Sequence, residues 1–176
     1  STGDAAQELT FVLSNIPDGL DPSVTNNSFA QYVLINCFEG LVTYDSTGTL
    51  VPGNAESWDI SDDGLTYTFH LRDGLKWSDG SDLTAEDYVY TIQRVLTPAT
   101  AAQYVSMATD YIKNAQEYYD GTATADDLGV KALDDKTLEI TLIQPTSYFI
   151  DILSIWTFSP VQKATVEANG DQWSTE

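Results

Sequence analysis

Apolar and polar residues alternate strictly over residues 65–71. The odd positions from Leu65 to Leu71 are all large and apolar, and Thr or His occupies the even positions between them. A period of two is typical of a strand with one buried face, and the turn signals at 62–64 and 72–74 bound it on both sides. Shorter strands are predicted at 8–13, 41–44 and 50–51, and a hairpin is predicted to join 130–133 to 137–142.

Helical spacing follows at two places. After Ser28, mostly apolar residues recur three and four positions apart as far as Cys37, which predicts a helix with Ser28 as its N-cap and Gly40 just past its end. A second helix is predicted to open at Thr84 and to stop before Pro98, because the residue before a proline is pushed out of the helical region. The apolar stripe of this second helix consists of Tyr88, Ile92 and Val95.

The remainder of the chain carries weaker helical patterns. Residues 101–119 are expected to be helical with an interruption near Thr109, residues 148–156 to form a helix or a strand, and residues 160–169 to form a helix ended by Gly170. Strands clustered before helices indicate the α+β class, a mixed sheet with flanking helices.

Charge narrows the range of partners. The chain has 27 acidic and 7 basic side chains among its 176 residues, a formal net charge of −20. A surface of that sign repels nucleic acid and anionic lipid, so neither is expected as a partner. The many aromatic residues argue against disorder. The single cysteine, Cys37, lies in an apolar stretch and is expected to be a small buried hydrophobe.

The motifs of catalysis and metal binding are missing from the sequence. It has no nucleophile elbow, no phosphate-binding loop and no dinucleotide fingerprint, and it has one histidine, His70. Asp59 and Asp63 resemble the start of a calcium loop, but His70 stands where that loop needs a glutamate, so a turn is predicted there instead. We expect no catalytic residue, no metal site and no cofactor. An acidic hydrolase, the enzyme alternative, would need a pair of carboxylates facing one pocket.

A series of motifs resembles the peptide-binding class of solute-binding proteins of ABC importers, and within it the oligopeptide-binding, OppA-like branch. The motifs occur in order at compatible spacing. They are Ala55–Trp58, Asp62–Phe69, Leu71–Gly74, Lys76–Gly80, Leu83–Asp87 and Gln93–Arg94, with Leu20–Pro22 and Phe38–Leu41 upstream and Asp127–Val130, Ala132–Asp135, Pro145 and Tyr148–Phe149 downstream.

The resemblance implies a longer, two-lobed protein. The chain would be the N-terminal third of a periplasmic binding protein-like fold. Residues 1–39 would form an incomplete first segment of lobe I, 40–160 a small extra domain, and 161–176 a truncated return into lobe I. The remainder of its own chain, the missing lobe, would then be a partner.

The resemblance also implies a ligand and a site. The family holds oligopeptides in extended form through main-chain hydrogen bonds and delivers them to ABC permease subunits. By position, the loop at Asn26, Asn27 and Ser28 would lie along the peptide, and Tyr104 would line a side-chain pocket. The family's enterobacterial pattern has an acidic residue, a glycine and a hydrophobe where this chain has Asn26, Asn27 and Ser28, so side-chain preference does not carry over.

Location and cargo follow from the same resemblance. An extracytoplasmic protein is implied, in the periplasm or at the cell surface, held to the membrane only by a lipid on a cysteine preceding Ser1. Two alternatives remain open. One is the same family with another cargo, such as a dipeptide, a nickel complex, an oligosaccharide or a pheromone, and the other is a surface adhesion or interaction module.

Overall fold

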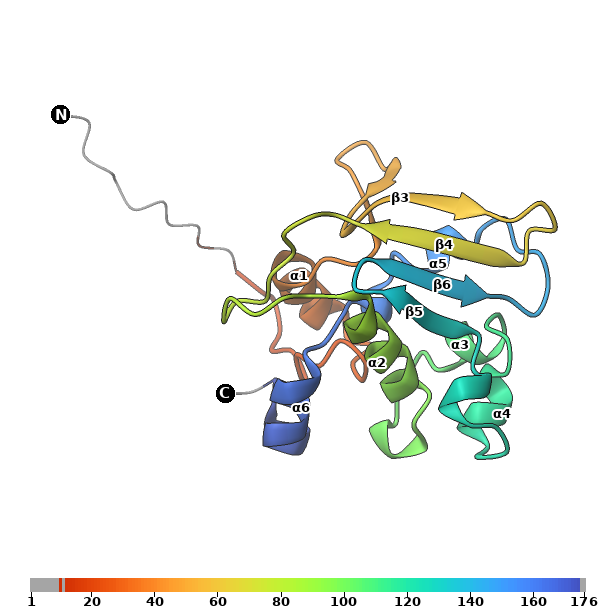
Figure 1. Ribbon diagram of the computed structural model, residues 1–176. Coiled ribbons are helices and arrows are strands. Elements are labelled where there is room, and N and C mark those ends of the chain that lie inside the picture. Colours follow the sequence, from red (N-terminus) through yellow and green to blue (C-terminus); the bar gives the residue numbers. More distant parts are fainter. Residues whose placement is uncertain (1–9, 11, 175–176) are drawn as a thin grey trace.

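The computed structural model describes residue 10 and residues 12–174. Four antiparallel strands form the main sheet in the order β3-β4-β6-β5 (Figure 1). They are β3 (Ala55–Ile60), β4 (Thr66–Leu71), β5 (Val130–Asp134) and β6 (Thr137–Thr141). A separate two-stranded sheet pairs β1 (Val42–Tyr44) with β2 (Leu50–Pro52). Of the strand expected at 8–13, residues 10, 12 and 13 belong to no strand and the others lie outside the described residues.

Strand β4 confirms the alternation read from the sequence. Tyr67, Phe69 and Leu71 are buried, whereas the Thr and His residues between them are only partly covered. His70 lies on this polar face, where its Nε2 is 2.9 Å from the Asp59 carboxylate on β3. The two outer strands are irregular, since the register of β3 shifts between Ala55 and Ser57 and that of β5 shifts between 132 and 134.

Helix α2 (Ala85–Val95) covers β5 and β6 and supplies much of the core. It begins as predicted after Thr84, whose backbone N–H donates to the Asp87 carboxylate at 2.8 Å, so the first turn is capped. Its buried stripe includes Tyr88, Ile92 and Val95, and it ends before Pro98. Figure 1 shows α2 below the sheet, with α6 to its left and α4 to its right.

Helix α1 (Ser28–Cys37) corrects two sequence-based expectations. Its N-cap is Asn27 and not Ser28, because the Asn27 Oδ1 accepts the backbone N–H of Phe29 at 2.8 Å. Cys37 is exposed, not buried. The reason is that α1 is apolar on most sides while only Ala30 and Leu34 are buried, so an apolar neighbourhood in sequence does not place Cys37 in the core.

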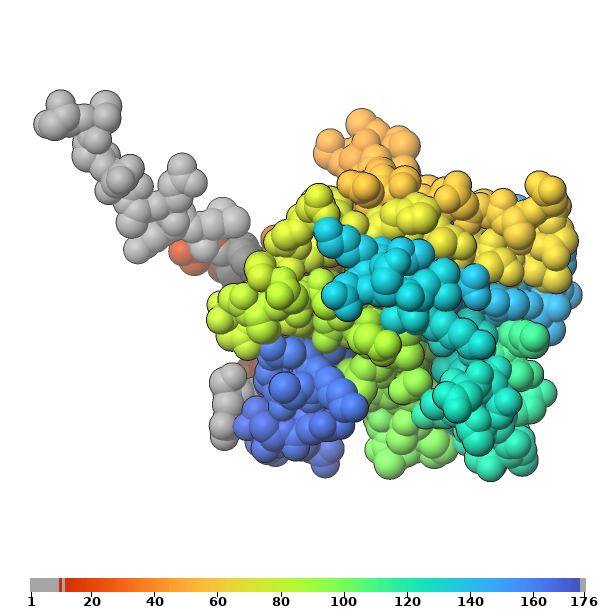
Figure 2. Space-filling model, viewed as in Figure 1, coloured from red at the N-terminus to blue at the C-terminus, as the bar shows by residue number. Residues whose placement is uncertain are grey.

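The other helices are short. The expected interruption near Thr109 is confirmed. Of the segment 148–156, expected to be a helix or a strand, residues 149–152 form a short helix. Residues 101–105 and 160–162, also expected to be helical, are not in a helix. The α-helices are α3 (Ser106–Thr109), α4 (Ala115–Tyr119), α5 (Phe149–Ile152) and α6 (Lys163–Asn169), and the 3-10 helices are η1 (Pro98–Thr100), η2 (Ala125–Asp127), η3 (Trp156–Phe158) and η4 (Gly170–Gln172). Figure 2 shows α6 beside the segment 72–83, where Gln162 Nε2 donates to the Asp79 carboxylate at 2.8 Å. No helix within the described ranges has the length and apolar composition needed to cross a bilayer.

The main hydrophobic core is confined to one stretch of the chain. Its members all fall between Leu41 and Phe158, and they come from the sheet, α2 and the short helices. Four buried apolar residues of the described chain lie outside this stretch and are not part of that cluster: Ala30 and Leu34 on α1, Val161 before α6 and Val166 on α6. The chain therefore folds around a central core that the segments before 41 and after 158 flank.

Candidate ligand-binding wall

The loop of residues 25–28 is held by its own side chains. Thr25 Oγ1 donates to the Asp18 carboxylate at 2.8 Å and accepts the backbone N–H of Asn27 at 3.1 Å. The Asn27 side chain is occupied in capping α1. These bonds fix the backbone on both sides of Asn26, so the loop is preorganised before anything binds to it.

Asn26 is the residue of this loop whose backbone groups are available to a ligand. Its side chain is exposed, and within the described part of the chain neither its backbone N–H nor its C=O has a hydrogen-bond partner. The neighbouring carbonyls are used, since Thr25 C=O accepts from Trp156 and Asn27 C=O accepts from the backbone of Gln31. One residue with a free donor and a free acceptor presents the same pair of groups as a residue on a strand edge.

Trp156 on η3 brings the predicted site residues together. Its indole Nε1 donates to Thr25 C=O at 3.0 Å, across 131 positions of sequence. On the other side, its ring meets the ring of Tyr104 edge to face, with centroids 5.8 Å apart and planes at 76°. We call this set, the loop 25–28 with Tyr104 and Trp156, the wall.

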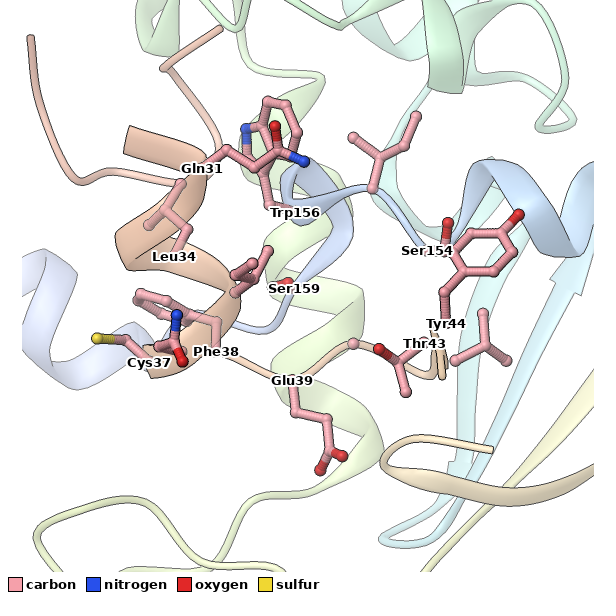
Figure 3. Close-up of a pocket in the computed structure, with 15 residues that line it drawn as sticks. Gln31, Leu34, Cys37, Phe38, Glu39, Thr43, Tyr44, Ser154, Trp156 and Ser159 are labelled. Atoms are coloured by element: carbon pink, nitrogen blue, oxygen red, sulfur yellow. The ribbon is translucent and has the colours of Figure 1, made fainter. Parts of the chain in front are cut away.

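Two hollows adjoin the wall. A pocket of about 300 Å³ is lined by Thr25 and Asn26 together with Asp18, Asp21 and Gln103. A larger one of about 640 Å³ lies between α1 and the segments 39–44 and 154–159, with Trp156 among its lining residues. Figure 3 shows Trp156 and Gln31 at one end of this larger pocket and Tyr44 with Ser154 at the other. The Tyr44 hydroxyl donates to the Asp151 carboxylate at 2.7 Å, and this bond raises the pKa of Tyr44.

Asp21, Arg94 and Trp173 form a group of charged and aromatic side chains next to the wall, which we call the clamp. The carboxylate of Asp21 accepts from Arg94 Nη1 at 2.9 Å, from Arg94 Nη2 at 2.5 Å and from the indole Nε1 of Trp173 at 2.9 Å. The Arg94 guanidinium also lies 5.7 Å from the centroid of the Trp173 ring. The clamp joins the loop near residue 21, helix α2 and the segment after α6, and it neutralises a carboxylate beside the smaller pocket.

A second polar network joins the segment after α1 to α2 and to the residues that flank β3 and β4. Arg72 Nη2 donates to the Glu39 carboxylate at 2.5 Å and to Asn54 Oδ1 at 3.2 Å. The Asn54 amide in turn donates to Glu39 C=O and to the Tyr88 hydroxyl. Burial raises the pKa of Tyr88 far above its usual value, so this phenol stays neutral and serves as a structural partner.

The described residues offer little for metal binding or catalysis. No three His, Cys, Asp or Glu residues among them are grouped so that they could hold a metal ion. His70 lies 2.9 Å from the Asp59 carboxylate on the exposed face of the sheet. The wall supplies main-chain hydrogen-bonding groups and aromatic surfaces.

The structure thus places Asn26, Asn27, Ser28 and Tyr104 around one feature, although contact of these residues with a ligand stays a prediction. The Asn27 side chain caps the N-terminus of α1, and Ser28 is the exposed first residue of that helix. Sequence reasoning missed Trp156 altogether. A tryptophan near the end of an apolar segment is an ordinary core residue by pattern, and its bond to Thr25 depends on long-range folding.

Comparisons with known proteins agree with this architecture. Residues 49–176 match the family model described as "Bacterial extracellular solute-binding proteins, family 5 Middle". The chain is 44% identical over 159 residues to the "Probable deoxycholate-binding periplasmic protein YgiS" of Escherichia coli, covering 90% of this chain and 30% of that protein. It is 41% identical over 172 residues to the periplasmic oligopeptide-binding protein OppA of the same organism, covering 96% and 32%.

Solved structures give the same picture. A periplasmic oligopeptide-binding protein of Borrelia burgdorferi, OppAIV, superposes with a TM-score of 0.87 at 46% identity, over 89% of this chain and 32% of that chain. Haemophilus influenzae OppA in complex with RPPGFSPFR gives a TM-score of 0.86 at 39% identity, over 90% and 31%. The chain spans about a third of the length of the relatives it matches. On the family match and this shared fold, the chain belongs to the bacterial extracellular solute-binding proteins of family 5.

Proposed function

We propose that this chain forms one side of an extracytoplasmic solute-binding protein that captures oligopeptides in extended form and delivers them to the membrane permease of an ABC importer. The observation that carries the proposal is the open backbone of Asn26. It offers a free N–H and a free C=O on a loop whose neighbours are already bonded. An extended peptide residue can pair with both groups, as two facing residues do in an antiparallel ladder.

Tyr104 gives the peptide a second contact in this proposal. Its ring is partly buried and is held against Trp156, so it presents a fixed aromatic surface beside the loop. Main-chain pairing at Asn26 would supply binding that is independent of peptide sequence, and the aromatic surface would accommodate one side chain. This division explains how a single protein could accept peptides of varied sequence.

The proposal keeps the domain division expected from the sequence. Residues 40–160 would be a small extra domain, and 1–39 and 161–176 would belong to lobe I. In support, the main hydrophobic core lies between Leu41 and Phe158. The remainder of the complete protein would then form the opposite side of the ligand site, and the permease subunits would recognise the closed state.

Location belongs to the proposal as well. The family is described as extracellular and the E. coli relatives as periplasmic. We therefore place the complete protein outside the cytoplasm and attach it to the membrane by a lipid. Metabolic labelling of cells with a radioactive fatty acid tests the attachment, and a complete gene product without label would refute it.

Calorimetry of the complete gene product tests the main proposal. Any co-purified ligand is first removed and identified by mass spectrometry. The titrants are short peptides that differ in side chains, together with the same peptides methylated on one backbone nitrogen at a time. We expect affinities that vary by no more than about tenfold with sequence, and a loss of about tenfold when methylation removes the donor that faces Asn26. Failure of every peptide to bind would refute the proposal.

One relative favours a second cargo. The E. coli protein with 44% identity is named for deoxycholate, an amphipathic carboxylate and not a peptide. The larger pocket beside the wall mixes apolar residues such as Leu34 and Ile35 with polar ones such as Gln31 and Thr43, which would suit such a molecule. Deoxycholate is therefore the matched titrant, and binding of deoxycholate without any binding of peptides would favour the second cargo.

A further inference from the structure

Trp156 occupies a position that the proposed function does not use directly. We propose that Trp156 is a positioning residue of the peptide site, which holds the loop 25–28 and the Tyr104 ring in one fixed relation. The inference rests on the proposed function, because it concerns how that site is built. Trp156 does not contact the peptide main chain in this proposal and acts through Thr25 and Tyr104.

The hydrogen bond to Thr25 determines what Asn26 presents. The Trp156 indole N–H donates a hydrogen bond to the Thr25 carbonyl at 3.0 Å. The Thr25 hydroxyl is hydrogen-bonded to the Asp18 carboxylate and to the backbone N–H of Asn27. With both neighbours of Asn26 held, its own N–H and C=O remain the open pair of the loop. Without the indole donor, the Thr25 carbonyl would be free to rotate or to compete for the donors of a peptide.

The ring of Trp156 determines where Tyr104 lies. The edge-to-face contact at 5.8 Å is a favourable aromatic geometry, and it couples a residue before α3 to a residue on η3. Trp156 is only partly buried and also lines the larger pocket next to Gln31 (Figure 3). The ring lies at the boundary between the loop, Tyr104 and the pocket, so one side chain contacts the loop through its N–H and Tyr104 through its ring.

A positioning role of Trp156 and a general contribution of Trp156 to stability predict different effects on peptide affinity. Removal of the indole donor should weaken all peptides by the same factor, because the main-chain pairing at Asn26 is shared by every peptide. Changes at Tyr104 should alter the order of preference among peptides, because that ring faces one side chain. Loss of stability alone would change the melting temperature without a uniform change in affinity.

The test compares Trp156→Phe with Trp58→Phe in the complete gene product. Phenylalanine at 156 keeps a ring beside Tyr104 and loses the donor. Trp58 is the matched control, because it is partly buried and packs on Phe69 at a centroid distance of 6.3 Å, and within the described chain no hydrogen bond or ring contact joins it to the wall. Calorimetry with the peptide set and amide exchange of residues 25–28 without ligand are measured for both variants.

We expect Trp156→Phe to weaken every peptide about fivefold and to speed amide exchange at residues 25–28, with neither effect in Trp58→Phe. Unchanged affinity in Trp156→Phe, with a wild type that binds, would overturn the inference and leave the proposed function standing. A loss confined to some peptides would also overturn it. A wild type that binds no peptide would refute the proposed function and the inference with it.

Discussion

The guanidinium of Arg94 on α2 faces the carboxylate of Asp21 with two hydrogen bonds, at 2.9 and 2.5 Å, across 73 positions of sequence. Both side chains are largely buried, with 13% and 15% of their surfaces exposed. This two-point contact links the loop before α1 to the helix that carries the core. It therefore couples the placement of the wall to the stability of the whole fold.

Asp21→Asn should destabilise the chain by about 2–3 kcal/mol, because it leaves the buried guanidinium without its counter-charge. Urea unfolding of the 176-residue chain measures the effect. Lys76→Met is the matched control: its partner Asp82 lies 2.5 Å away but the pair is well exposed, so a change below about 0.5 kcal/mol is expected. Equal effects of the two variants would contradict this account of Asp21.

Thr91 should be intolerant of Val despite the similar shape. Its hydroxyl is fully buried, accepts the backbone N–H of Val161 at 2.9 Å and donates to Asp87 C=O at 2.8 Å. Thr91→Val leaves the Val161 N–H unpaired in the interior, at a cost of about 2 kcal/mol.

The control for Thr91→Val is Thr97, which lies just past the C-terminus of the same helix. Thr97 donates to Gln93 C=O in the same way but is exposed, so Thr97→Val should change stability little. Thermal unfolding measures both variants, and amide exchange at Val161 should speed up only in the first. Unchanged stability of Thr91→Val, with slow amide exchange at Val161, would show that the hydrogen bond from the Val161 N–H to Thr91 does not stabilise the fold.

Asp79 should contribute to stability in a pH-dependent way. Bonds from Ser81 and from Gln162 lower its pKa to about 2. A carboxyl whose pKa is lowered by folding stabilises the chain above its unfolded pKa of 3.8, and this contribution is lost as the pH falls through about 2. The stability difference between the wild type and Asp79→Asn should therefore be constant at neutral pH and shrink between about pH 4 and pH 2.

The Asp79 titration can be followed directly by carbon NMR of the carboxyl group. Ser81 is the largest cause of the lowered pKa, so Ser81→Ala should move the titration back toward 3.8. A titration of Asp79 that does not respond to Ser81→Ala would contradict this assignment.

The 176-residue chain by itself should bind oligopeptides no better than millimolar. One wall provides a single open residue, Asn26, and one aromatic surface, which is too little contact to offset the entropy of holding a flexible peptide. Calorimetry on the chain and on the complete gene product compares the two directly. Micromolar binding by the chain alone would show that no second lobe is needed.

Local signals in the sequence predicted the elements around which the chain folds. The alternation over 65–71, the opening of a helix at Thr84 and its stop before Pro98 all depend on neighbours within a few residues, and the structure confirms them. Cys37 was misassigned because the pattern of α1 is apolar on several sides and does not reveal which side is covered.

The wall and the clamp could not be predicted from pattern alone. Trp156 meets Thr25 across 131 positions, and Trp173 meets Asp21 across 152. Neither pair leaves a periodic trace in the sequence. The resemblance predicts Tyr104 and the loop at Asn26–Ser28 as ligand-binding residues, and that role stays a prediction. Trp156, which contacts both Thr25 and Tyr104, becomes visible only in three dimensions.

The irregular registers of β3 and β5 have a consequence for the two edges of the main sheet. A smooth outer strand can pair with any extended chain that meets it, including the edge strand of another copy of the protein. Shifts between Ala55 and Ser57 and between Ala132 and Asp134 interrupt both outer strands. The sheet is thereby a poor template for addition of a foreign strand, and unspecific self-association is disfavoured at both of its margins.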